Sequence, residues 1–225
     1  MTSSAASLAG RTFEEILRTP PPTLAAGVSA LIDMASFWKA AGPERYFARS
    51  DEFDEQLIQR YSTIYPAVHS ERITPTIPSS SSFSSSLSPE KEGSNLADQH
   101  LGMILLLDQY PRNAFRGSAK QYQSDALARK WADIAIKHGI DRKVDSTLCT
   151  FFYLPFGHSE DLADQNRAVE LGERLGDPFL SFAKEHRDVV AKFGRFCHRN
   201  QVMARETTKE ESLWMANEAP AWAKS

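Results

Sequence analysis

Apolar residues recur every three or four positions along most of this chain, and no segment alternates strictly between apolar and polar residues. That spacing places the apolar side chains of each segment on one face of an α-helix, whereas a half-buried strand would need a period of two. The pattern therefore predicts an all-α protein of about eight helices, over residues 24–41, 51–65, 95–110, 124–138, 146–156, 159–175, 178–193 and a short segment after 208.

Proline and serine divide the chain into parts. Pro20, Pro21 and Pro22 separate a short helix predicted at 12–18 from the next helical segment. Residues 74–94 are rich in serine and proline, and such a stretch buries too little apolar surface to offset its ordering entropy. We therefore expect a partly disordered extension at 1–22, one helical domain at 23–216, a disordered loop inside it at 74–94, and a C-terminal tail at 217–225.

Capping residues and prolines predict where individual helices begin and end. Proline disfavours helical geometry in the residue before it, so Pro111 predicts that its helix ends or kinks just before it. Ser159 is placed to cap the helix that comes after it, and Glu160 and Asp161 would lie near the positive N-terminal end. These two acids therefore have a structural explanation as well as a functional one.

Composition and charge exclude several classes of protein. The formal net charge is −3, which gives no general attraction to nucleic acid. No apolar run approaches the roughly 20 residues of a membrane span, and residues 1–10 lack a hydrophobic signal core. Cys149 and Cys197 form neither a disulfide framework nor a zinc-binding spacing. We expect a cytoplasmic protein that binds neither nucleic acid nor membranes.

The common cofactor motifs do not occur in the sequence. It contains no glycine-rich phosphate loop, dinucleotide fingerprint, zinc-binding His-Glu-x-x-His helix or Gly-x-Ser-x-Gly nucleophile turn. His158, Glu160 and His198 are residue types that bind metals, but their spacing matches no metal-binding signature. We therefore expect a protein that uses no metal, nucleotide or other cofactor.

Clusters of polar residues come after apolar stretches at three places in the second half of the chain. They lie in the runs 105–113, 153–161 and 193–200. A polar group that enters a core costs free energy unless it is hydrogen-bonded or paired. We therefore expect the three runs to meet, either as the lining of a ligand site or as a structural network.

Arginine and histidine in these runs suit ligand binding and proton transfer. A guanidinium offers paired donors to a carboxylate or phosphate, so Arg112, Arg195 and Arg199 are candidates for binding an anion. His158 and His198 are candidates for moving a proton, because histidine titrates near neutral pH.

The same residues also have structural interpretations. Asp108 and Arg112 could neutralise each other across one helical turn, and the other arginines could pair with nearby acids. Cys197 lies beside Arg195 and His198, whose charges could lower the pKa of its thiol. A buried and inert thiol is the alternative.

Taken together, these runs resemble the DUF924 family. The resemblance is carried, in order, by Leu106 to Asn113, by His158 to Asp161 with Gln165, and by Phe193 to Asn200. It covers about residues 30–65 and 96–215, although Cys197 stands where the family usually has proline. Membership would imply an all-helical fold with tetratricopeptide-like superhelical packing. It would not imply an activity, because the family's function is unknown.

The first functional hypothesis is a small-molecule enzyme that needs no metal or nucleotide. Its ligand would carry an anionic or carbonyl group, and the reaction would be an isomerisation, cyclisation, elimination or hydrolysis. The candidate catalytic residues are His158, Glu160 and His198. The candidate substrate-binding residues are Asp108, Gln109, Arg112, Asn113, Arg116, Trp38, Tyr153, Phe156, Asp161, Gln165, Arg195, Arg199 and Asn200.

The second hypothesis is a non-catalytic helical adaptor. In it the polar network would only hold helix ends together, and a groove of the tetratricopeptide-like array would bind a peptide, a protein partner or a second copy in a homodimer. A convergence of His158, Arg195 and His198 would favour the first hypothesis, whereas a long open groove would favour the second.

Overall fold

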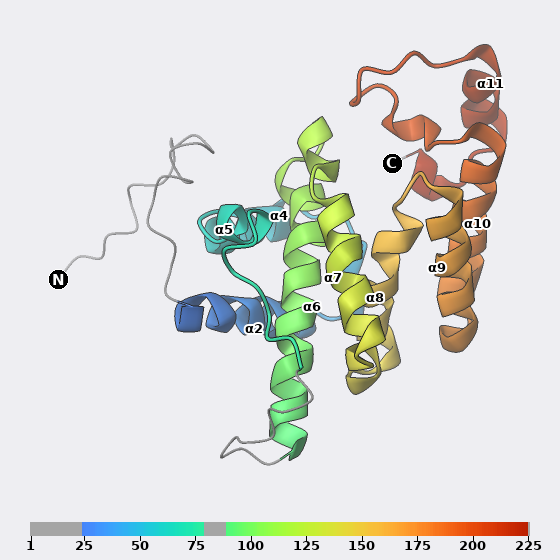
Figure 1. The fold of residues 1–225 in the computed structure, drawn as a ribbon. Coiled ribbons are helices and arrows are strands. Elements are labelled where there is room, and N and C mark those ends of the chain that lie inside the picture. The colour runs from blue at the N-terminus through green and yellow to red at the C-terminus, as the bar shows by residue number, and fades with distance from the viewer. Residues whose placement is uncertain (1–23, 79–88, 225) are drawn as a thin grey trace.

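The computed structural model describes residues 24–78 and 89–224, and all regular structure in these ranges is helical (Figure 1). This confirms the predicted all-helical class. The short helix expected at 12–18 and the extension at 1–22 lie outside the described residues.

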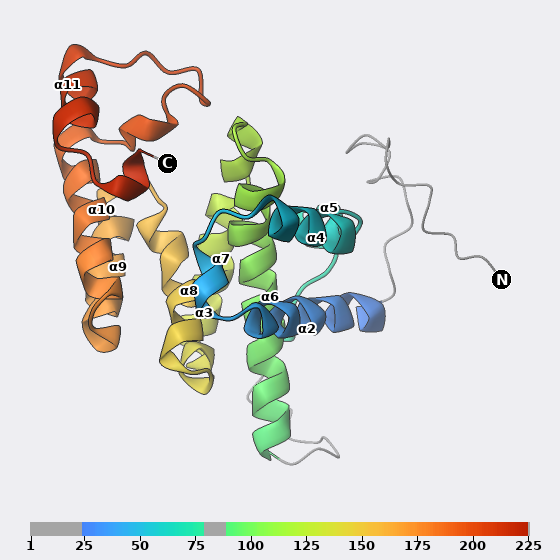
Figure 2. The same ribbon diagram turned by 180° about the vertical axis from the view of Figure 1, so that it is seen from behind.

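The long helix α6 (Pro89–Ala114) runs through the middle of the molecule, and α2 (Leu24–Ala41) crosses it steeply (Figures 1 and 2). Three short helices between α2 and α6 in the sequence are α3 (Pro43–Tyr46), α4 (Asp51–Tyr61) and α5 (Tyr65–His69). After α6 come the 3-10 helices η1 (Ala119–Tyr122) and η2 (Ile140–Lys143), which flank α7 (Asp125–Lys137).

The second half of the fold is a row of neighbouring helices. The row continues from α7 through α8 (Ser146–Gly157) and α9 (Leu162–Leu175) to α10 (Phe179–Phe193), each packed against the one before it (Figure 1). The chain then forms η3 (Cys197–Arg199), α11 (Lys209–Asn217) and η4 (Ala221–Ala223) at one end of α10.

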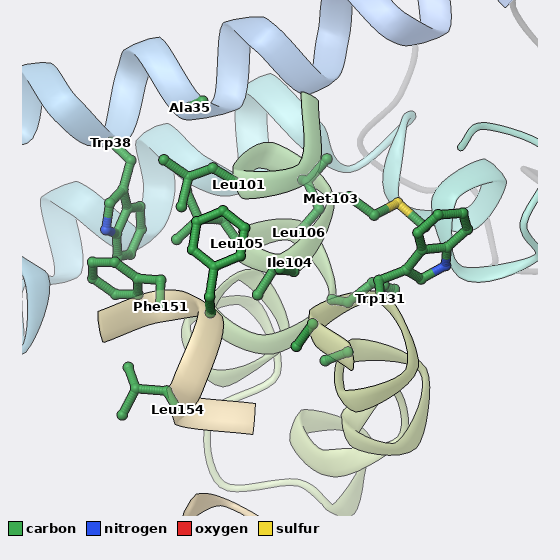
Figure 3. Packing of buried hydrophobic residues seen from close by; sticks show 14 of the residues in the cluster. Ala35, Trp38, Leu101, Met103, Ile104, Leu105, Leu106, Trp131, Phe151 and Leu154 are labelled. Atoms are coloured by element: carbon green, nitrogen blue, oxygen red, sulfur yellow. The ribbon is translucent and has the colours of Figure 1, made fainter. Parts of the chain in front are cut away.

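The main core lies where α2, α6 and α8 meet. Trp38, Leu105 and Phe151 point into this space, as Figure 3 shows, and all three are essentially inaccessible to solvent. A Cβ atom built at Gly102 would lie 1.9 Å from the carbonyl oxygen of Leu31. Glycine is therefore required there, because the backbones of α2 and α6 touch at the crossing.

Of the two outcomes predicted for Pro111, an end or a kink of the helix, the end does not occur, because α6 continues to Ala114 with the proline inside it. Proline lacks an N–H group, which leaves the carbonyl of Leu107 without its usual helical donor. The hydroxyl of Ser124 supplies one instead, at 2.6 Å. A side chain from the next helical segment thus allows α6 to extend past the proline.

Three other boundaries differ from the predicted ones. The helix expected at 51–65 is divided into α4 and α5 by a turn at 62–64. The backbone at 89–94, expected to be loop, already belongs to α6. The expected tail contains η4, in which Ala223 is buried. The serine-rich residues 79–88 lie outside the described part of the chain.

Two clusters of buried apolar residues hold this fold. The larger one extends from α2 to the first half of α10. The smaller one is built from α10, η3, α11 and the residues after α11, and consists of Val189, Val190, Phe196, Cys197, Trp214, Ala219 and Ala223. Among the described helices, none has the length and apolar character needed to cross a membrane.

Candidate functional site

The three polar runs supply side chains to one region of the molecule. Asp108 and Arg112 lie in the last two turns of α6, His158 is the residue that ends α8, and Arg199 is in η3. Charged side chains join these elements through Asp108 and through Asp125 at the start of α7. The expected convergence is therefore found for part of the predicted set.

His158 is held by a buried carboxylate. Its Nδ1 lies 2.8 Å from Oδ1 of Asp108, whose side chain is only 1% exposed. Asp108 also accepts a hydrogen bond from Gln109 and lies 3.3 Å from the Arg112 guanidinium. Despite burial, the charges of Arg112 and His158 and these hydrogen bonds keep the pKa of Asp108 below its ordinary value. Asp108 is thus an anion that orients the imidazole.

Asp125 joins the arginine of α6 to the arginine of η3. Arg112 donates two hydrogen bonds to its carboxylate, at 2.8 and 3.0 Å. Arg199 approaches the same carboxylate at 3.7 Å. From the sequence, Asp125 is identified only as a residue at the start of a helix. Its pairing with Arg199 could not be predicted, because the two residues are far apart in the chain and meet only in the folded protein.

Tyr122 is a second residue that the sequence analysis did not identify. Its ring faces the guanidinium of Arg199 at 4.4 Å and that of Arg112 at 5.6 Å. Phe196 faces Arg199 as well, at 4.5 Å. Aromatic faces attract cations, so these rings hold Arg199 in place without using its N–H groups.

The side chain of Arg199 is buried, yet its guanidinium makes no hydrogen bond within the described residues. Its side chain is 7% exposed and its Nε is a buried donor without a partner. Burial and the neighbouring charge of Arg112 lower the pKa of Arg199. A buried guanidinium normally has its donors satisfied, so Arg199 is suited to accept an anionic ligand.

Both candidate histidines are neutral at pH 7. Burial and the charge of Arg112 lower the pKa of His158. Burial and the charge of Arg199 lower the pKa of His198 to about 4, and the buried Nδ1 of His198 has no hydrogen-bond partner among the described residues. A proton on His158 would disfavour protonation of His198, and a proton on either ring would disfavour protonation of His186, so the three rings lie within electrostatic reach.

Glu160 has a structural role in these contacts. Its carboxylate accepts hydrogen bonds from the backbone N–H of Phe196 at 2.8 Å and from Arg205 at 2.7 and 2.9 Å. The hydrogen bonds from Arg205 and Phe196 lower the pKa of Glu160 despite its partial burial. Glu160 therefore positions η3, and with it Arg199, instead of serving as a free acid or base.

Arg195 and Asn200 are engaged at the far side of η3. Arg195 donates to both carboxylate oxygens of Glu211, at 2.6 and 2.9 Å, and Asn200 donates to the same carboxylate at 3.3 Å. Glu211 also completes the capping box with Thr208 at the start of α11. Arg195 thus fastens α11 to the end of α10 and does not join the group around Arg199.

The thiol of Cys197 is not activated. Burial and the negative charge of Glu211 raise its pKa to about 11. Of the two possibilities for Cys197, the raised pKa agrees with an inert thiol and not with one activated by Arg195 and His198. Cys197 contributes to the smaller apolar cluster, which agrees with the alternative of an inert thiol.

The cap of α9 is Asp161, and the prediction of Ser159 as the cap is wrong. The Asp161 side chain accepts from the N–H groups of Ala163 and Asp164, and the residue is exposed at the surface. Gln165 is fully buried and donates to the carbonyls of Gly157 and Ser159. Both predicted site residues therefore stabilise the chain around His158 and do not face the arginines.

Asn113 and Arg116 make contacts outside the charged group around Arg199. Asn113 donates to the carbonyl of Gln109 within α6. Arg116 pairs with Asp54 of α4 at 2.9 Å on the surface. Gln109 alone stays near the site, through its hydrogen bond to Asp108.

The predicted aromatic walls lie in the core. Trp38 packs against Tyr46, Phe53 and Phe151. The hydroxyl of Tyr153 donates to Asp141 at 2.7 Å, on the side of η2. Phe156 is buried under the guanidinium of Arg167, at 4.4 Å. The aromatic residues that do contact the charged group are Tyr122 and Phe196.

An open hollow of about 490 Å³ lies elsewhere, between the end of α2, α3, α6 and the start of α8. Its lining includes Lys39, Tyr46 and Lys143, and it contains neither of the candidate histidines. Among the described residues, no three His, Cys, Asp or Glu side chains are grouped so as to hold a metal ion.

Comparison with known proteins gives one family and one related structure. The family model described as "bacterial protein of unknown function (DUF924)" matches residues 34–219. A solved structure of a protein of unknown function from Agrobacterium tumefaciens is 42% identical, with a TM-score of 0.71, and the match covers 87% of this chain and 99% of that chain. No curated protein matches. The family match spans every charged residue around Arg199 and His158.

Proposed function

This chain belongs to the DUF924 family, and we propose that it binds a small molecule by an anionic or carbonyl group and moves a proton on it. The observation that carries the proposal is the Arg199 guanidinium, which is buried, held by two aromatic rings and without a hydrogen bond in the described chain. An oxyanion of a ligand would satisfy its donors and would replace the long contact with Asp125.

His158 is the proposed general base. Its Nδ1 donates to Asp108, which leaves Nε2 as the proton acceptor, and the side chain is 13% exposed. The lowered pKa keeps the imidazole in its neutral, proton-accepting form at pH 7. Asp108 is a positioning residue that selects the tautomer, as a buried carboxylate does for other catalytic histidines.

The arginines would stabilise the charge that proton removal creates. A base beside fixed cations suits abstraction of a proton next to a carbonyl or carboxylate, or activation of a water molecule. The proposed reaction is therefore an isomerisation, cyclisation, elimination or hydrolysis. His198, which is partly buried and precedes Arg199 in η3, is the proposed second proton-transfer group.

We also propose tetratricopeptide-like packing for the second half of the fold. The order of the row α7, α8, α9 and α10, in which each helix packs on its predecessor, supports it. Such arrays often bind peptides, and the open hollow beside Tyr46 and Lys143 is the part of the surface that favours the alternative function of an adaptor.

A binding experiment with matched variants tests the proposed ligand site. The full-length protein is screened by thermal shift against small carboxylates, phosphates and carbonyl compounds. A ligand at a hundredfold excess over its Kd should stabilise the unchanged protein by about 2.7 kcal/mol. The Arg199→Gln variant should fold and lose this response. The Arg187→Gln variant is the control, because Arg187 pairs on the surface with its neighbour Asp188.

Turnover separates binding from catalysis. With a ligand identified, His158→Gln should abolish its conversion and leave the thermal shift nearly unchanged. If no compound stabilises the unchanged protein, or if Arg199→Gln responds equally, the proposed site is wrong. If the unchanged protein binds ligands without converting any of them, it is a binding protein and the proposed catalysis is wrong.

A further inference from the structure

Tyr122 occupies a position between the two arginines that contact Asp125. It is the last residue of η1, which packs against α6, and its ring faces both guanidiniums, at 4.4 and 5.6 Å. Because Arg112 comes from α6 and Arg199 from η3, the Tyr122 ring contacts arginines from two separate elements of the site.

The hydroxyl of Tyr122 has no structural partner. No hydrogen bond to it occurs within residues 24–78 and 89–224, and its oxygen is accessible to solvent. Among the described residues the hydroxyls of Tyr61, Tyr65 and Tyr153 are hydrogen-bonded, whereas those of Tyr46 and Tyr110, like that of Tyr122, are not. Tyr122 differs from these two in its place beside the guanidiniums of Arg199 and Arg112. The phenol group of Tyr122 is therefore free to contact a ligand.

The phenol remains a neutral donor in spite of the nearby cations. Burial and the negative charges of Asp125 and Glu160 raise the pKa of Tyr122, and they outweigh the opposing charges of Arg199 and Arg112. A neutral O–H group beside two guanidiniums can donate a hydrogen bond to an oxyanion that they hold.

We propose that the Tyr122 hydroxyl donates a hydrogen bond to the anionic group of the ligand, which makes Tyr122 a specificity-determining residue. The inference rests on the proposed function and adds a third donor to Arg199 and Arg112. It also defines the ligand group as an oxyanion, a carboxylate or a phosphate, because a neutral carbonyl would gain less from two cations and a phenol.

The Tyr122→Phe variant tests the hydroxyl alone, because phenylalanine keeps the ring that faces the guanidiniums. Inorganic phosphate and acetate are titrated into the full-length protein at constant ionic strength with chloride as the balancing anion. Loss of one hydrogen bond to a charged group should weaken the affinity for the anion that binds by about tenfold. The melting temperature without anion should stay unchanged.

Two further variants make the outcome decisive. Tyr46→Phe is the matched control, since Tyr46 lines the separate hollow, and it should bind the anions as the unchanged protein does. Equal affinity in Tyr122→Phe, with loss of binding in Arg199→Gln, would overturn the role of Tyr122 and leave the arginine site intact. Failure of the unchanged protein to bind either anion would overturn both proposals.

Discussion

The two apolar clusters of this protein are stabilised in different ways. The larger cluster is filled by bulky side chains such as Trp38, Leu105 and Phe151, which are almost fully excluded from water. The smaller cluster, at α10, η3 and α11, has few large apolar residues and is joined by buried charged groups such as Glu211. Hydrophobic burial therefore dominates the first region, and ion pairs contribute much more to the second.

The candidate site lies at the boundary between these regions. Asp108, Arg112 and Asp125 come from helices of the larger cluster, whereas Arg199 comes from the smaller one. A site of this kind has a rigid half and a half whose position depends on charge pairing. Changes in the second region should therefore affect ligand binding before they unfold the molecule.

The largest effect should come from a cavity in the larger cluster. Leu105→Ala removes a fully buried side chain and should lower the free energy of unfolding of the whole protein by about 4 kcal/mol. Chemical denaturation measures this loss, and Leu105→Met, which conserves volume, is the control with a small effect. A loss below 1 kcal/mol for the alanine variant would contradict the assignment of this region as the main core, on the usual range for such cavities of roughly 2–5 kcal/mol.

A smaller and local effect is expected from the charge that fastens the second region. Glu211→Gln weakens a part-buried bidentate pair with Arg195 and should destabilise this region without unfolding the rest of the molecule. Hydrogen exchange should rise in residues 195–217 and stay unchanged in α6. The exposed neighbour Glu210 provides the control Glu210→Gln. An equal increase in hydrogen exchange in α6 and in residues 195–217 would show that the two regions do not differ in this way.

Mild acid should weaken the second region through its histidines. Burial lowers the pKa of His198 to about 4 and that of His186 to about 3. The folded state resists protonation of these histidines, while the unfolded state accepts protons below about pH 6.5. Their contribution to the free energy of unfolding is therefore fully present above that pH and is lost as the pH falls. Between pH 7 and pH 5 each histidine should cost about 2 kcal/mol.

Carboxylates lose their contribution to stability in a lower pH range. The hydrogen bond from Arg195 lowers the pKa of Glu211 to about 2, so its contribution is lost only as the pH falls below about 4.5. Unfolding curves measured from pH 8 to pH 3 should therefore show two stages. His186→Phe should reduce the first stage and leave the second, and an unchanged first stage would contradict the assignment to buried histidines.

The smallest effect should come from an exposed ion pair in the same region. Arg187 and Asp188 are neighbours on α10, and the Asp188 side chain is 66% exposed. Asp188→Asn should change the free energy of unfolding by less than about 0.5 kcal/mol. A larger loss in denaturation experiments would show that net charge, and not the buried pairs, stabilises the region.

Helix positions were largely predictable from local spacing. The segments at 24–41 and 146–156 match α2 and α8 closely, because amphipathic periodicity depends on neighbours one turn away. The continuation of α6 past Pro111 was not predictable. This continuation depends on a donor from Ser124, which only the folded chain brings to the carbonyl of Leu107.

The site was predictable in its residue types more than in its pairs. The runs containing Asp108, His158 and Arg199 do meet, but Glu160 and Arg195 are used to hold η3 and α11. Asp125 and Tyr122 were not identified, since a carboxylate at a helix start and a tyrosine in a short turn have ordinary local explanations. Their importance comes from contacts with residues far away in the sequence.

Sequence alone determined the helical class, the family resemblance and the three stretches that carry ionic side chains, because each of these depends on the order of residues along a short segment. Tertiary structure decided which charges satisfy one another and, in the part of the chain that the structure describes, that the buried guanidinium of Arg199 is left without a hydrogen bond. Pairing is a competition among many compatible donors and acceptors, and distances in the folded chain select the partners. Arg195 thus acquired Glu211, while Arg199 was left with aromatic rings and a distant carboxylate.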